Sequence, residues 1–265
     1  MDYTEIAAYF GAIFIGLVLG LIGGGGSILT IPIFVYILDL DPVIATGYSL
    51  FVVGSVALVG AIRNAQKGMI EYKIGFVFSI PTFLAVYATR RYLVPSIPDE
   101  LFTLGDFVVT KGIAIMVFFA IVMIVASYSM IKGRKEKEGN EELEYNYPRI
   151  IVQGIGVGLV TGLVGAGGGF LIIPALVILA HLPMKRAVAT SLMIIAINSL
   201  IGFLGDIQTI EIDWAFLLSF TGIATIGIFI GLYLTNFIAG AKLKKGFGWF
   251  VLVMGVYIIS KEFIF

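Results

Sequence analysis

Eight long apolar runs constrain the fold of this chain more than any other feature of its sequence. They lie at about residues 5–38, 43–62, 74–92, 107–131, 150–180, 187–205, 214–238 and 247–263. Six of the runs are about 17–25 residues long, which is the length of one helical crossing of a bilayer. Because 59% of the 265 residues are hydrophobic and 13% are charged, a water-soluble fold would expose large apolar patches. The sequence therefore predicts an all-α polytopic membrane protein surrounded by the lipid bilayer.

Composition excludes several classes of function. The 17 basic and 17 acidic residues cancel, so the charge balance gives no indication of a nucleic-acid partner. With no cysteine and one histidine, the chain cannot form disulfides, iron–sulfur clusters or Cys/His zinc sites. We therefore expect no metal and no cofactor. A membrane-embedded enzyme would have few catalytic groups, so we also expect no enzymatic activity.

Two of the apolar runs are too long for a single crossing. The runs at 5–38 and 150–180 are each interrupted by glycine, at 23–26 and at 165–169. Adjacent glycines favour a departure from helical geometry. Each long run is therefore predicted to be two helical pieces joined by a glycine turn. Neither run contains a charged residue beyond Glu5, which argues against a cation pump driven by buried carboxylates.

The chain also repeats itself. The segment GLIGGGGSILTIP at 20–32 matches GLVGAGGGFLIIP at 162–174. The two segments begin 142 residues apart, and this distance is called the repeat offset below. The same offset aligns positions 13–72 with the second half without a gap. It pairs Gly16 and Gly20 with Gly158 and Gly162. Glycines spaced in this way are typical of closely packed membrane helices.

Loop charges predict the orientation of the two halves. Basic residues follow the second, fourth, fifth and seventh runs, whereas acidic residues lie at 39–41 and at 206–213. Because basic loops stay in the cytoplasm, the segment 132–149 is predicted to be a cytoplasmic linker, with both termini outside the inner (plasma) membrane. The repeats at 1–131 and 150–265 are then inverted relative to each other, which is a recurring plan of secondary transporters.

The glycine turns are the strongest candidate for a binding site. Each precedes a helical piece, and a helix N-terminus presents unpaired N–H groups and a partial positive charge to an anion. Hydroxyls in neighbouring runs could replace the rest of the hydration shell of an anion. The predicted substrate-binding residues are Gly24, Gly25, Gly26, Ser27, Thr46, Ser49, Ala166, Gly167, Gly168, Gly169, Thr190 and Ser191. The alternative is that the glycines only permit close packing and that the hydroxyls only bond neighbouring helices.

Two charged or titratable residues leave their roles open. Arg63 ends a predicted span, where it either attracts an anion to the cytoplasmic face or anchors the helix at the interface. His181 is the one histidine of the chain, and the loop charges place it in a cytoplasmic loop.

The doubled glycine motif resembles the sulfite exporter TauE/SafE family. The resemblance rests on GLIGGGGSILTIP with a downstream ATGYS, and on GLVGAGGGFLIIP with a downstream ATSLM. Its motif positions are Gly23, Gly25, Gly26, Pro32, Gly165, Gly167, Gly168 and Pro174. The resemblance implies a bacterial or archaeal inner-membrane carrier of sulfite, thiosulfate or organosulfonates.

We therefore predict a secondary transporter of a small, sulfur-containing anion that works by alternating access. An anion channel that uses the same turns is the first alternative, and a receptor or assembly subunit that binds without flux is another. The sequence leaves the anion, the direction, the coupling ion and the oligomeric state open, a homodimer included.

Overall fold

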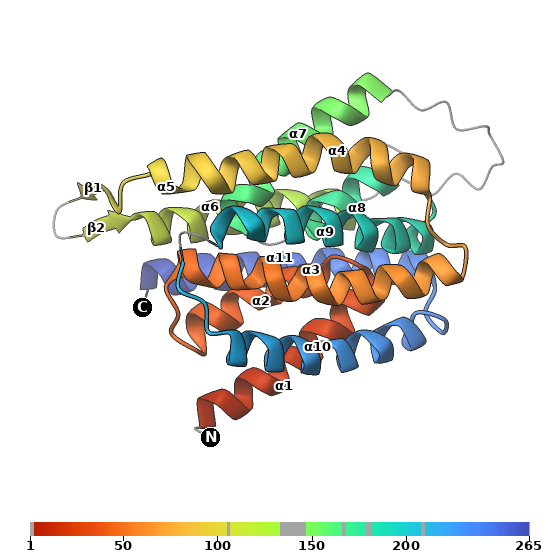
Figure 1. Cartoon of the computed structure of the whole chain (residues 1–265), viewed down its shortest axis with the longest axis horizontal. Helices are drawn as coiled ribbons and strands as arrows, with labels where there is room; N and C mark the ends of the chain where they lie inside the picture. Colours follow the sequence, from red (N-terminus) through yellow and green to blue (C-terminus); the bar gives the residue numbers. More distant parts are fainter. Residues whose placement is uncertain are drawn as a thin grey trace.

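The protein forms a bundle of helices that run back and forth between two ends (Figure 1). The computed structural model describes residues 3–104, 107–132, 147–165, 168–178, 182–207 and 210–264. The helices of the first half are α1 (Tyr3–Ile22), α2 (Gly25–Tyr36), α3 (Pro42–Gln66), α4 (Tyr72–Ala88) and α6 (Lys111–Ile131). Those of the second half are α7 (Tyr147–Val164), α8 (Gly169–Ile178), α9 (Met184–Asp206), α10 (Trp214–Leu234) and α11 (Gly240–Ile264).

Helix α4 continues into a connection whose π-helical turn and β-hairpin the sequence did not predict. It passes into the π-helical turn η1 (Thr89–Leu93) and the single turn α5 (Val94–Ser96). An antiparallel hairpin follows, made of β1 (Glu100–Leu104) and β2 (Phe107–Thr110). The fourth apolar run was expected to be helical from residue 107, but its helix begins at Lys111 because the residues before it pair in β2.

Acidic side chains set the starts of two long helices. Asp41 accepts hydrogen bonds from the backbone N–H groups of Val43 and Ile44, at 2.8 and 3.3 Å, and Pro42 occupies the first turn of α3. Asp213 accepts one from Phe216 N at 3.0 Å and caps α10 in the same way. Side-chain caps satisfy N–H groups that have no partner inside a helix. The acidic residues that mark these two loops therefore have a structural role as well.

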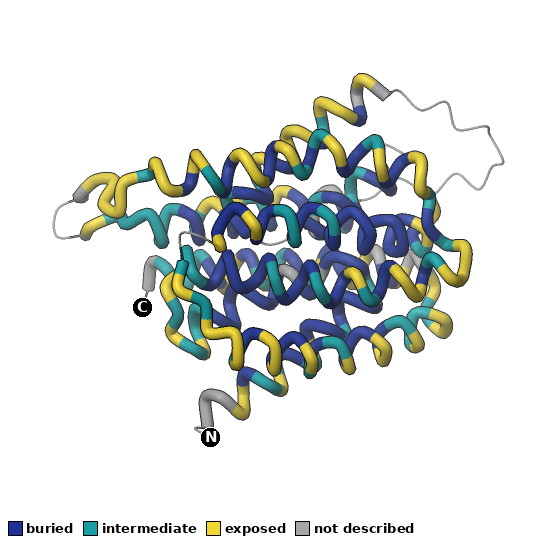
Figure 2. The backbone as a smooth tube through the Cα atoms, viewed as in Figure 1, coloured by how far each residue is buried: buried dark blue, intermediate teal, exposed yellow. Residues whose placement is uncertain are grey.

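The surface of the bundle is suited to lipid. Five helices in the described part of the chain are long and apolar enough to cross a membrane: Pro42–Gln66, Tyr72–Ser96, Lys111–Tyr128, Met184–Asp206 and Trp214–Leu234. Large apolar side chains, among them Phe10, Val125 and Val152, are exposed on the outside, while the central helices are buried (Figure 2). An exposed apolar surface of this extent marks a membrane protein. The prediction of an all-α polytopic membrane protein is confirmed.

The loops gather at the two ends of the bundle (Figure 1). One end, here the hairpin end, carries the β1–β2 hairpin, the segment 37–41 and the segment 210–213. The other, here the Lys67 end, carries the segments 67–71 and 235–239. Helix α1 starts at the hairpin end and α2 returns to that end, while α7 starts at the Lys67 end and α8 returns to it. Each glycine-broken run thus turns back inside the bundle.

The contact between α1 and α10 is repeated by the contact between α7 and α4, which the repeat offset matches. A Cβ built on Gly16 of α1 would overlap the Ala224 carbonyl of α10, and one on Gly158 of α7 would lie 2.5 Å from the Thr82 carbonyl of α4. Both contact pairs are related by the repeat offset. The glycine pairs therefore serve close helix packing, as predicted. The correspondence also supports the interpretation of the chain as two inverted repeats, which remains a proposal.

Candidate binding site at the glycine turns

The two glycine turns leave helical geometry where the sequence predicted. The first turn, residues 23–24, lies between α1 and α2, and Gly23 has φ +78°. The second turn, between α7 and α8, is described at Gly165 and Gly168, with φ +71° and +70°. Side chains disfavour this left-handed region, so glycine is required at these three positions. Ala166 and Gly167, two of the predicted binding residues, lie outside the described residues.

The two turns meet inside the bundle. A Cβ built on Gly24 would overlap the backbone of Gly169, and one on Gly169 would lie 2.5 Å from Gly24 Cα. Helix α2 begins at Gly25 and α8 begins at Gly169, so their N-termini come together there. Gly24 precedes α2 and supplies no capping side chain. Two positive helix ends repel each other, and an anion between them would offset that repulsion.

Helices α3 and α9 each press one face against the turn of the opposite half. A Cβ on Gly23 would lie 2.7 Å from Ser191 Oγ and 3.0 Å from Val188 Cα, both on α9. A Cβ on Gly165 would overlap Thr46 Cβ on α3 and lie 2.8 Å from Thr46 Cα. The repeat offset maps Thr46 onto Val188. The same backbone position therefore carries a hydroxyl at the second turn and a methyl group at the first.

The structure brings some of the predicted hydroxyls to the turns. Thr46 and Ser191 are fully buried against them, and Ser191 Oγ donates to Val188 O at 2.8 Å. Ser49 lies one helical turn beyond Thr46 on α3 and is fully buried. Thr190 is not brought to the turns, since its Oγ1 accepts a hydrogen bond from Glu71 N, at the Lys67 end.

Among the predicted glycines, Gly26 and Gly168 pack against the helices that precede their own turns. A Cβ on Gly26 would lie 2.5 Å from Ile15 O, and one on Gly168 would overlap the Thr161 hydroxyl. Gly25 and Ser27 both belong to the first turn of α2.

Several buried polar atoms on the helices that carry or cover the turns have no hydrogen-bond partner in the described residues. They include Ser49 Oγ, Thr161 Oγ1 and both polar atoms of the Asn198 side chain. Asn198 lies two helical turns beyond Ser191, on the same face of α9, and Ile195 between them touches Gly169. Buried polar groups are normally paired, and unpaired ones indicate a bound water or ligand. These atoms are therefore candidates to bond a water or a ligand held near the turns.

A buried ion pair next to the second turn was missed by the sequence analysis. Arg90 of η1 is fully buried, and its Nε donates to both carboxylate oxygens of Asp206, at 2.9 and 2.7 Å. Its Nη2 donates to Asp206 as well. Asp206 was expected in an outer loop, but it is the last residue of α9 and is buried. Buried charge therefore does occur in the bundle, outside the two glycine-broken runs.

Arg90 also reaches the second turn through one intermediate hydroxyl. Its Nη1 donates to Thr46 Oγ1 at 2.9 Å and to Gly162 O at 3.4 Å. Thr46 in turn covers Gly165. Since Arg90 and Asp206 lie far apart in the sequence and in different halves, no local motif connects them. A signal was nevertheless present, because two arginines at 90–91 fall inside the predicted run at 74–92.

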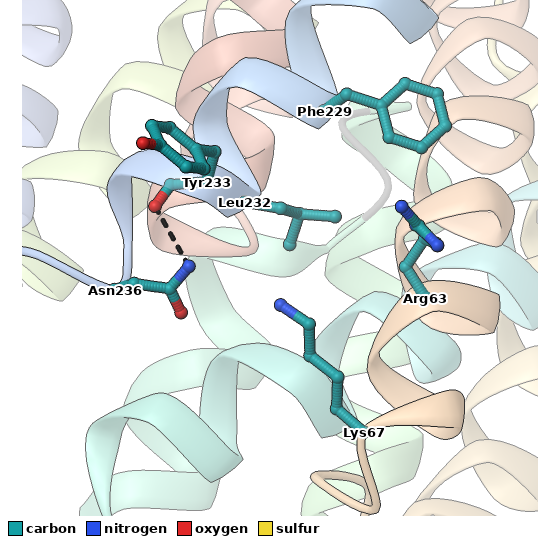
Figure 3. A pocket seen from close by; sticks show the side chains of 6 residues that line it. All are labelled: Arg63, Lys67, Phe229, Leu232, Tyr233 and Asn236. Atoms are coloured by element: carbon teal, nitrogen blue, oxygen red, sulfur yellow. Dashed lines mark hydrogen bonds between the residues drawn. The ribbon is translucent and has the colours of Figure 1, made fainter.

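A cationic pocket opens at the Lys67 end. It lies between the ends of α3 and α10 and is lined by Arg63, Lys67, Phe229, Leu232, Tyr233 and Asn236 (Figure 3). The Arg63 guanidinium lies 5.7 Å from the centre of the Phe229 ring. None of these lining residues is acidic, so the pocket is suited to attract an anion. His181, the other residue of open role, lies outside the described residues.

Comparison with known proteins points to membrane transporters. A profile of the family described as sulfite exporter TauE/SafE matches residues 8–258. A protein of Xylella fastidiosa (strain 9a5c) named "Probable membrane transporter protein" is 27% identical over 255 residues, covering 94% of this chain and 92% of that protein. "Probable membrane transporter protein YunE" of Bacillus subtilis (strain 168) is 28% identical over 220 residues, covering 77% of this chain and 78% of its own length. No solved structure shows a significant match to this chain.

Proposed function

Because the chain belongs to the sulfite exporter TauE/SafE family, we propose that it is a secondary transporter that carries a small, sulfur-containing anion across the membrane by alternating access. Sulfite, thiosulfate and organosulfonates are the candidate substrates. The observation that carries the proposal is the meeting of two helix N-termini at Gly24 and Gly169. We propose no enzymatic activity.

The chemistry of this meeting point favours an oxyanion. Backbone N–H groups of the first turns of α2 and α8, together with the Ser49 and Thr161 hydroxyls, can donate to several oxygens of one small anion. The Asn198 amide can donate two further hydrogen bonds. Tetrahedral or pyramidal sulfur oxyanions present oxygens in several directions, which suits donors that come from several different helices.

The arrangement of the helices supports alternating access. Each turn is covered by a helix of the opposite half, so movement of the repeat 1–131 against the repeat 150–265 would change access to both turns together. In this proposal the segment 132–149 links the repeats in the cytoplasm, the Lys67 end faces the cytoplasm and the termini face outward across the inner membrane. The basic residues Arg63, Lys67, Lys185 and Arg186 favour this orientation.

Counterflow in proteoliposomes tests the proposal. The purified protein is first screened for a shift in thermal stability with thiosulfate, sulfite, sulfoacetate and taurine, because a ligand of the native state raises its apparent stability. Exchange of the radiolabelled hit against the unlabelled anion is then measured. A transporter shows stimulation by anion on the opposite side, whereas a channel with the same turns gives flux without it.

The site is tested by Gly24→Ala, with Gly156→Ala as the matched control. The new methyl at position 24 would force the two turns apart, whereas a Cβ at Gly156 meets nothing within 4 Å. We expect Gly24→Ala to lower exchange about tenfold or more and the control to exchange like the wild type. Unchanged exchange by a folded Gly24→Ala protein would contradict the assignment of the turns.

A further inference from the structure

The ion pair at the hairpin end has no charged counterpart at the repeat-related positions of the other end. The repeat offset matches Asn64 with Asp206 inside the aligned segment, and, extended past residue 72 along α4 and α10, it matches Arg90 with Leu232. Asn64 is buried and donates to Gly60 O at 2.9 Å, within its own helix, while Leu232 lines the open pocket at the Lys67 end (Figure 3). The matched positions thus hold a buried ion pair at the hairpin end, whereas at the Lys67 end they are neutral and one of them lines the cationic pocket.

The contacts of Arg90 connect four segments that would have to separate for the hairpin end to open. Arg90 belongs to η1, and it bonds Asp206 on α9, Thr46 on α3 and the Gly162 carbonyl on α7. A π-helical turn within a helix is frequently found at a functional site. In this arrangement Asp206 supplies a carboxylate, which is itself an oxyanion, to the guanidinium beside the second turn.

From this geometry we propose that Arg90 is the cationic residue that binds the transported anion and that Asp206 occupies it in the unloaded state. The inference rests on the proposed function. An incoming oxyanion replaces the Asp206 carboxylate on Arg90, because a guanidinium forms bidentate hydrogen bonds with a carboxylate and with other oxyanions alike. The exchange releases η1 from α9 and opens the hairpin end.

The exchange also defines the coupling ion. Once displaced, the Asp206 carboxylate would be a buried charge without the guanidinium, which is costly inside a membrane protein. Binding of one proton neutralises it, so one proton enters the site with each anion and leaves with it. Arg90 contacts Asp206 directly. The other titratable groups on the segments at this end are Asp41, Tyr48, Tyr87, Arg91, Tyr92, Glu211 and Asp213. Tyr48 is engaged with the backbone of the 210–213 segment, where its hydroxyl donates to Glu211 O and accepts from Asp213 N.

Two variants and a control separate this inference from a purely structural role. Asp206→Asn removes the competing carboxylate and imitates its protonated form. Arg90→Leu combined with Asp206→Asn gives the hairpin end the residues of the Lys67 end, without leaving a buried charge unpaired. Arg91→Leu removes the neighbouring arginine, which lies outside the ion pair, and serves as the matched control.

The probe is radiolabelled thiosulfate, which remains a dianion throughout the neutral pH range, so any proton that moves with it must be carried by the protein. In wild-type proteoliposomes we expect counterflow and accumulation driven by an imposed pH gradient. We expect Asp206→Asn to keep counterflow within about threefold, with a lower KM, and to lose the pH-driven accumulation. We expect the double variant to raise the KM at least about tenfold, and Arg91→Leu to behave like the wild type.

The outcomes distinguish the two proposals. Absence of thiosulfate and sulfite counterflow in the wild-type protein removes the proposed function and this inference with it. Wild-type counterflow together with an unchanged pH response in Asp206→Asn, or an unchanged KM in the double variant, overturns the inference alone. Equal loss of folding and flux in both variants, measured by gel filtration and counterflow, would assign the pair to structure and also overturn it.

Discussion

The two glycine turns have similar backbones but different surroundings. The first turn is covered by Val188 and Ser191 of α9, neither of which carries charge. The second turn is covered by Thr46 of α3, whose hydroxyl accepts a hydrogen bond from the buried Arg90. The two helix N-termini are therefore alike in backbone, while a buried cation reaches only the second turn. In the proposed transporter, this difference would let the two ends bind the same anion but open under different conditions.

The largest effect is expected from a side chain placed at the turns themselves. Gly165→Ala would put a methyl group into a left-handed backbone and into Thr46, so we expect it to destabilise the fold by about 3 kcal/mol or more. Gly23→Ala faces the same backbone penalty with looser contacts to Ser191 and Val188, and we expect about 2 kcal/mol. Thermal unfolding of the purified variants measures both. Equal destabilisation would mean that the two turns are packed alike and would remove this part of the comparison.

A smaller effect is expected when the second turn is given the side chain of the first. Thr46→Val reproduces Val188 at the matched position and removes the hydroxyl that accepts from Arg90 Nη1. Loss of a hydrogen bond to a charged group costs about 1.5–3 kcal/mol, so we expect the KM for the anion to rise about tenfold or more. Thr46→Ser keeps the hydroxyl and is the control that should restore wild-type kinetics. If Thr46→Val and Thr46→Ser behave alike, the charged side of the site does not depend on this hydroxyl.

The sequence predicted the backbone turns of the candidate site better than the side chains that surround them. The helix breaks at Gly23 and Gly165 follow from local backbone physics, so the sequence alone could identify them. The pair Arg90–Asp206 could not be derived, because it depends on which ends of α4 and α9 meet across the two halves of the chain. Thr190 shows a second dependence on the fold. Adjacent residues of a helix point about 100° apart, so Thr190 and Ser191 could not both face the first turn, and only the fold decides which does.

The smallest effect concerns the matched serines of α3 and α9. Ser49 Oγ is buried without a partner, whereas Ser191 Oγ bonds the carbonyl of Val188. Removing an unsatisfied buried hydroxyl is near neutral or stabilising, so Ser49→Ala should keep or slightly raise the unfolding temperature, while exchange of the anion falls about threefold to tenfold. Ser191→Ala loses a made hydrogen bond and should cost about 0.5–1.5 kcal/mol of stability with little effect on exchange. Thermal unfolding and counterflow of the two variants should therefore change in opposite senses. A loss of stability without a loss of exchange in Ser49→Ala would mean that this hydroxyl serves the packing of α3 and that the anion is held by the turns and Arg90 without it.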